Sequence, residues 1–143
     1  MPSNEGTALS MDHPTADALL ASPLLAVLSP DARAELAQRF DVEEFDSGHR
    51  IVTEGSAGYA FYVVASGTVE VSAEGRALRT LGVGDFFGEI SILGEGRRTA
   101  TVTAVGPVEV WSLFGTTFRV LQLSRPDVAE SLTAAMNDRL AAG

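Results

Sequence analysis

The sequence predicts a mainly β fold with flanking helices: about eight strands form a jelly-roll-like β-roll, preceded by N-terminal helices and followed by two C-terminal helices. Over residues 41–114, glycines separate short β-rich runs, as in β-sandwiches and rolls. The flanking segments, 16–40 and 115–140, instead space their apolar residues as helices do. A chain of 143 residues with 45% hydrophobic content can bury a substantial core as one domain.

The N-terminal part is expected to be a mobile tail followed by helices. Residues 1–14 are polar, include Pro and Gly, and show no periodicity, so the domain proper is expected to span 15–143. Helices are predicted at 16–28 and 29–40. Ser29 is a suitable N-cap for the second helix, because its hydroxyl can accept a backbone N–H and a proline follows at the first helical position.

Two runs indicate how the strands of the roll face its core. Residues 68–72 alternate, which places Val69 and Val71 inward and Glu70 outward. Residues 59–65 are nearly all apolar, so this strand is expected to be buried on both faces and central in its sheet.

The C-terminal part is predicted to form one helix at 115–123 and a second, amphipathic helix that begins at Pro126. Side chains of this second helix recur at helical spacing: Val128, Leu132, Ala135 or Met136, and Arg139 or Leu140. With the sequence ending at Gly143, no DNA-reading helix-turn-helix is expected after this helix. The net charge of −9 also disfavours a general nucleic-acid surface, so no direct nucleic-acid binding is expected.

The composition excludes several kinds of catalytic and metal site. The chain has no Lys for a Schiff base or P-loop, and no Cys for thiol catalysis, disulfides or thiolate zinc sites. Its two histidines are too few for a three-histidine metal centre. The N-terminus lacks the basic start of a secretory signal, and the longest apolar stretch, 19–28, is far shorter than the roughly 20 residues that span a bilayer. We expect a cytoplasmic, non-catalytic protein with no metal, no cofactor and no membrane insertion.

The segment 86–101 is the most informative stretch, because it is suited to hold an anion. Glycines, beginning with Gly88, allow the backbone to turn into a short helix and out again, and the N-terminus of such a helix offers N–H groups to a phosphate oxygen. Arg98 adds a fixed positive charge on a planar fork of donors. Glu89 can accept a hydroxyl hydrogen, such as one from a ribose.

The residues after Arg98 predict the direction of its side chain. Small apolar residues alternate there with threonines: Ala100, Val102 and Ala104 with Thr101 and Thr103. A period of two carried backwards places Arg98 on the inward side and Arg97 on the outward side. An inward arginine requires an anion, because an unpaired buried charge costs several kcal/mol.

These residues resemble the phosphate-binding cassette of the cyclic nucleotide-binding domain family, in which a Phe-Gly-Glu turn is followed nine residues after the Glu by an Arg. Here the pair is Glu89 and Arg98. The run 96–102 looks most like the cassettes of cyclic nucleotide-gated channels, and catabolite-activator-like regulators and kinase regulatory subunits share the pattern. The resemblance covers roughly residues 24–140 and implies a β-roll with the cassette between its sixth and seventh strands.

The resemblance also implies a ligand, cAMP by default with cGMP as the alternative, and a set of contact residues. These are Phe87, Gly88, Glu89, Ile90, Ser91, Arg98, Thr99, Ala100, Val71 and Arg139. Ser91 is expected to contribute its backbone N–H to the phosphate. Thr99 lies near the nucleotide in channel-like members and can favour cGMP, although strict alternation points its hydroxyl away from the pocket. Val71 fits a purine contact or ordinary core, and Arg139 fits a lid over the base or a solvated helix arginine.

The resemblance implies a regulatory sensor that transmits binding through movement of its C-terminal helix. Ile92 and Phe118 match positions at which the family couples the cassette to the helix after the roll. The implied partner is an effector domain or protein contacted through that helix, and a homodimer is compatible with the sequence. Two other hypotheses stay open: an interaction module with a degenerate pocket, and a cupin-type enzyme.

Overall fold

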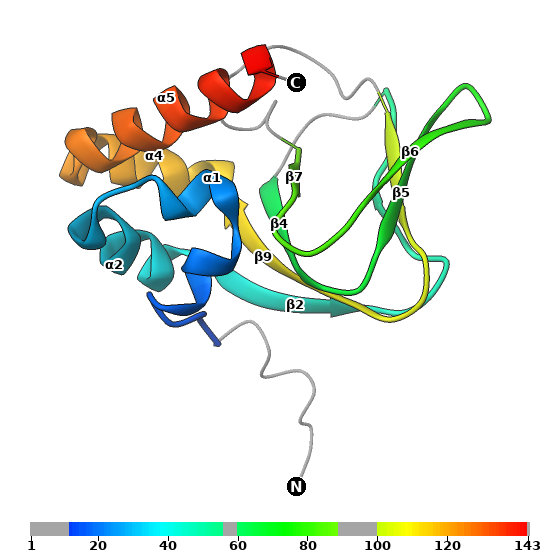
Figure 1. Cartoon of the computed structure of the whole chain (residues 1–143), viewed down its shortest axis with the longest axis horizontal. Coiled ribbons are helices and arrows are strands. Elements are labelled where there is room, and N and C mark those ends of the chain that lie inside the picture. The colour runs from blue at the N-terminus through cyan, green and yellow to red at the C-terminus, as the bar shows by residue number, and fades with distance from the viewer. Residues whose placement is uncertain (1–11, 56–59, 89–99, 143) are drawn as a thin grey trace, which may run out of the picture.

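The computed structural model describes residues 12–55, 60–88 and 100–142, which form a β-roll with helices gathered on one side of it (Figure 1). Eight described strands form two antiparallel four-stranded sheets, with orders β2-β9-β4-β7 and β3-β8-β5-β6. The strands are β2 (Asp41–Phe45), β3 (Arg50–Val52), β4 (Ala60–Ser66), β5 (Val69–Ala73), β6 (Arg76–Leu81), β7 (Phe86–Phe87), β8 (Thr101–Ala104) and β9 (Val108–Phe114). The predicted mainly β fold is confirmed.

The helices come from both ends of the chain and pack together (Figure 1). They are η2 (Ala18–Ala21), α1 (Pro23–Ala26), α2 (Pro30–Arg39), α4 (Gly115–Ser124) and α5 (Pro126–Ala142). The Ser29 cap is confirmed, because the Ser29 hydroxyl accepts the Ala32 N–H at 3.1 Å. Both C-terminal helices begin close to their predicted positions.

The prediction of one continuous helix at 16–28 is wrong. The segment forms the 3-10 helix η2 and then the short helix α1, with Ser22 extended between them at φ −99° and ψ 122°. Proline disfavours the helical conformation in the residue before it and is well suited to the first position of a new helix. Pro23 therefore ends one helix at Ser22 and starts another.

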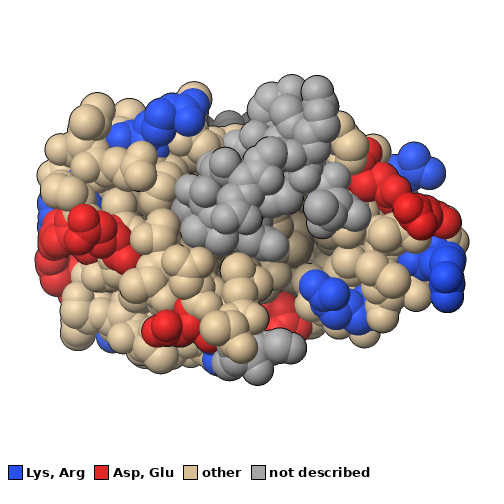
Figure 2. Space-filling model, turned by 90° about the horizontal axis from the view of Figure 1, so that it is seen from above, with Lys and Arg blue, Asp and Glu red and all other residues tan. Residues whose placement is uncertain are grey.

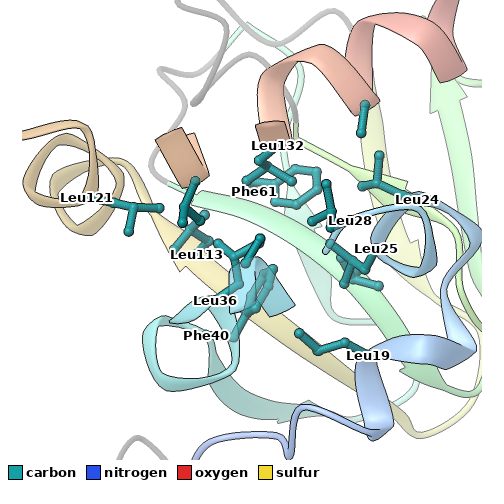
Figure 3. Close-up of a cluster of buried hydrophobic side chains, with 14 of the residues drawn as sticks. Leu19, Leu24, Leu25, Leu28, Leu36, Phe40, Phe61, Leu113, Leu121 and Leu132 are labelled. Atoms are coloured by element: carbon teal, nitrogen blue, oxygen red, sulfur yellow. The ribbon is translucent and has the colours of Figure 1, made fainter. Parts of the chain in front are cut away.

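Strand β4 separates two hydrophobic cores, and its predicted burial on both faces is confirmed. Phe61 and Val63 face a helical core shared with the helices, in which Leu19, Leu24, Leu25, Leu28, Leu36, Phe40, Leu113, Leu121 and Leu132 also lie (Figure 3). Tyr62 and Val64 face a roll core between the two sheets. One face of β4 therefore packs against the helices, and the other face lines the interior of the roll.

Helix α5 is anchored on the helical core by one face. Val128, Leu132, Ala135 and Met136 are buried there, as the helical spacing predicts. Arg139 and Leu140, the two alternatives for the next position of this face, are both exposed, so the buried face does not extend to either. The buried stripe ends with Met136, and residues 137–141 are exposed.

The last residues of the expected tail form hydrogen bonds near the start of β2. Residues 1–11 lie outside the described part of the chain. The Asp12 carbonyl accepts the Val42 N–H at 3.0 Å, and His13 Nδ1 lies 2.7 Å from the Phe40 carbonyl oxygen. Hydrogen bonds therefore hold Asp12 and His13 at the start of β2.

Candidate functional site

The predicted cassette occupies the connection between the two sheets. Strand β7 leads into it from the β2-β9-β4-β7 sheet, and β8 leaves it in the β3-β8-β5-β6 sheet. These are the sixth and seventh described strands, so the expected place of the cassette in the roll is confirmed. Five of the predicted contact residues lie outside the described residues: Glu89, Ile90, Ser91, Arg98 and Thr99.

The structure brings three predicted contact residues together at the roll core. Val71 is 4% exposed and pairs with Val102 of β8, and Phe87 is 5% exposed. The Phe87 ring stacks on Tyr62, with centroids 5.0 Å apart and planes 20° apart. Ala100 is partly buried against the same core. The inward direction predicted for Val71 and Ala100 is confirmed, and both ends of the cassette are anchored on one apolar core.

Gly88 has a backbone conformation that favours glycine. Its φ is 80°, in the left-handed region, where a side chain with a Cβ is strained. This position follows directly after the buried Phe87. The Phe-Gly-Glu order therefore has a local physical reason, because a bulky anchor must be followed by a residue able to turn the chain sharply.

The loop before β7 is fixed to the N-terminal helices. The Ser22 hydroxyl, fully buried, donates to the Gly84 carbonyl at 2.8 Å. The Gly82 N–H donates to the Asp85 carboxylate at 2.9 Å, and the Gly84 N–H donates to the Val64 carbonyl at 2.9 Å. The loop before β7 is therefore hydrogen-bonded both to strand β4 and to the junction between η2 and α1.

The Glu54 carboxylate, for which the sequence predicted no role at the site, lies at the other end of the cassette. Glu54 accepts the Thr101 hydroxyl and the Glu74 N–H, and its own N–H donates to the Thr101 hydroxyl. Alternation places Thr101 away from the core, yet its exposure is only 9%, because the hydroxyl is covered by this hydrogen-bonded turn. Glu54 and Thr101 are 47 residues apart, so no local pattern links them.

Charged side chains join α2 to the start of α5. The Arg125 guanidinium contacts the carboxylates of Asp31 at 2.5 Å, Asp127 at 3.0 Å and Glu35 at 3.4 Å. Hydrogen bonds from Arg125 lower the pKa of Asp127, and hydrogen bonds to Asp127 and Asp31 raise the pKa of Arg125. Arg139, on the last turns of α5, is exposed and belongs to neither this cluster nor the roll core.

Other kinds of site find little support among the described residues. In residues 12–55, 60–88 and 100–142, no group of three or more His, Asp or Glu side chains could hold a metal ion. No helix in that part of the chain is both long enough and apolar enough to cross a membrane. On the face seen in Figure 2, the drawn arginines are separated by acidic and uncharged side chains and form no continuous basic surface.

A family model and several known proteins match this chain, and the family match covers the β-roll. The family model described as "Cyclic nucleotide-binding domain" matches residues 42–124. The cAMP-dependent protein kinase regulatory subunit of Yarrowia lipolytica is 37% identical over 100 residues, which is 70% of this chain and 27% of that protein. A cGMP-dependent protein kinase of Caenorhabditis elegans is 43% identical over 93 residues, 60% of this chain and 12% of that protein.

A solved structure shows the same architecture. The catabolite activator protein of Thermus thermophilus superposes with a TM-score of 0.70 at 36% sequence identity, covering 84% of this chain and 59% of that chain. The chain thus spans about a quarter or less of the two kinase relatives and somewhat over half of the solved regulator.

Proposed function

The chain belongs to the cyclic nucleotide-binding domain family, and on this premise we propose that it binds a cyclic nucleotide in the cassette and acts as a non-catalytic regulatory domain. One observation carries the proposal: the Glu89 to Arg98 spacing occurs in the connection between β7 and β8 of a β-roll. Both ends of this connection rest on the roll core, through Phe87 and Ala100.

Each proposed contact has a chemical role. The Arg98 guanidinium and the Ser91 N–H bind the cyclic phosphate, and Glu89 accepts a ribose hydroxyl hydrogen. The left-handed φ of Gly88 turns the chain directly after Phe87, and Ile90 is a further proposed contact. The remaining proposed contacts lie towards the base or line the pocket: Phe87, Thr99, Ala100, Val71 and Arg139. The default ligand is cAMP, with cGMP as the alternative, and relatives named for each nucleotide support keeping both.

We expect cAMP or cGMP, but not the linear 5′-AMP, to stabilise the purified chain. A ligand at 100 times its dissociation constant adds about 2.7 kcal/mol to the free energy of unfolding, because it binds only the folded state. Parallel titration calorimetry and thermal melts with the three nucleotides measure occupancy and base preference together. The absence of heat and of a melting shift with both cyclic nucleotides would contradict the proposal and favour an interaction module with a degenerate pocket.

The proposed output is a change in the position of helix α5. The Ser22 to Gly84 hydrogen bond joins the approach to the cassette with the N-terminal helices, and Arg125 joins α2 with the start of α5. Phe118 of α4 is buried in the same helical core as Leu132 of α5. A ligand that moves the cassette would thus shift the population of two arrangements of the helices.

We expect saturating cAMP to change hydrogen exchange along α5 more than along β2. Helix α5 carries the proposed movement, whereas β2 pairs with β9 through five residue pairs in the opposite sheet from β8. Exchange measured by mass spectrometry with and without cAMP gives the comparison, and 5′-AMP is the control. Equal protection of α5 in both states would contradict transmission through this helix even if the nucleotide binds.

In this proposal the regulated partner is an effector domain or protein that contacts α5, and a homodimer through the same helix is compatible with it. The expected cytoplasmic location belongs to the same proposal. A cupin-type enzyme is the alternative from another class, and metal analysis of the purified protein separates it from a nucleotide sensor.

A further inference from the structure

We propose that Glu54 is a positioning residue for the nucleotide site, which fixes the point at which the chain leaves the cassette. The inference rests on the proposed function. It concerns a residue that touches neither the phosphate nor the base in that proposal and that acts through Thr101.

The Thr101 side chain forms two hydrogen bonds with Glu54, one to its backbone and one to its carboxylate. The Glu54 N–H donates to Thr101 Oγ1 at 3.1 Å, and the Thr101 hydroxyl donates to Glu54 Oε1 at 3.2 Å. Thr101 is the first residue of β8 and follows Arg98 by three positions. Because its hydroxyl is used as both acceptor and donor, Thr101 has little freedom to rotate or to shift along the strand.

The same carboxylate also holds the hairpin that carries Val71. Glu54 Oε2 accepts the Glu74 N–H at 3.1 Å. Glu74 and Gly75 join β5 to β6 with φ values of 52° and 77°, the pattern of a type I′ turn, in which a glutamate is strained. Glu54 therefore links the chain after β3, the β5–β6 turn and the start of β8, which are three connections around one end of the roll.

We expect Glu54→Ala to weaken cAMP binding by about fivefold or more, because the Thr101 hydroxyl and the Glu74 N–H both lose their carboxylate acceptor and the first residue of β8 is held less firmly. Thr101→Val should weaken binding by a similar factor, and Thr101→Ser should retain the parent affinity because the hydroxyl remains. Glu54→Gln keeps an acceptor oxygen and should retain most of the affinity. The double variant Glu54→Ala/Thr101→Val should lose less affinity than the product of the two single losses, since both single variants remove the bond from the Thr101 hydroxyl to the Glu54 carboxylate.

Glu43→Ala is the matched control, because it removes the same kind of contact from the other sheet. The Ser112 hydroxyl, fully buried, donates to Glu43 Oε1 at 2.6 Å between β2 and β9. This variant should lower thermal stability and leave the cAMP affinity unchanged. Calorimetric affinity and melting temperature are measured for every variant.

The outcomes separate the two proposals. A parent chain that binds cAMP while Glu54→Ala and Thr101→Val bind equally well would overturn the positioning role and leave the proposed function standing. An affinity loss in Glu43→Ala as large as that in Glu54→Ala would also overturn it, since general destabilisation would then be the cause. A parent chain that binds no cyclic nucleotide would overturn both proposals.

Discussion

Arg98→Ala should weaken cyclic nucleotide binding by tens-fold or more. A guanidinium forms charge-assisted hydrogen bonds to a phosphodiester, and each is worth roughly 1.5–3 kcal/mol. Two such bonds lost together exceed the 1.4 kcal/mol that corresponds to a tenfold change. Titration calorimetry of the variant with cAMP and with cGMP measures the loss.

The neighbouring arginine provides the matched control for this prediction. Alternation from β8 places Arg97 on the outward side, so Arg97→Ala should change affinity by less than about threefold. Arg98→Lys should be intermediate, because lysine keeps the charge but loses the planar fork that contacts two oxygens at once. Equal affinities for Arg98→Ala and the parent, or a large loss only in Arg97→Ala, would show that Arg98 is not the phosphate ligand.

Much of the fold follows from local pattern, because most elements obey rules that act over a few residues. The run 59–65 predicts a strand buried on both faces, and β4 is buried on both faces. Ser29, with Pro30 after it, predicts the start of α2, and the hydroxyl caps that helix. Alternation at 68–72 predicts the inward direction of Val71. These signals lie within one element, where neighbouring residues decide the outcome.

Local pattern fails at the helix break, although a signal is present. Leu19, Leu24 and Leu25 are all buried, so apolar residues enter the core on both sides of Ser22. Pro23 prevents one helix from running through these residues, because it restricts the residue before it. The apolar pattern is correct about which side chains enter the core and wrong about the backbone that presents them.

The contacts that support the candidate site could not be predicted, because they join residues far apart in the sequence. Ser22 and Gly84 are 62 residues apart, and Glu54 and Thr101 are 47 residues apart. A hydroxyl or a carboxylate at such a position looks like any polar loop residue until the fold brings its partner close. The motif predicts the phosphate ligand, Arg98, while the tertiary structure shows what holds both ends of the cassette.

Gly84→Ala should be among the most destabilising glycine substitutions in the chain, lowering the free energy of unfolding by about 2–4 kcal/mol. Gly84 has a φ of 92°, where alanine is strained. A Cβ added there would also lie 2.8 Å from the Ala21 carbonyl oxygen and 3.1 Å from Pro23 Cδ. The first of these is a backbone atom of Ala21, the last residue of η2, so it can move only if that helix shifts.

Gly106→Ala separates the two causes of destabilisation, because Gly106 has a similar positive φ but no close contact. Gly106 has a φ of 91°, and a Cβ added there would meet nothing within 4 Å. It should cost only the left-handed conformation of alanine, about 1–2 kcal/mol. Urea unfolding of both variants measures the difference, which is the cost of separating the loop before β7 from the helices. Equal destabilisation of the two variants would contradict a tight contact between Gly84 and the junction of η2 and α1, through which the cassette is proposed to reach helix α5.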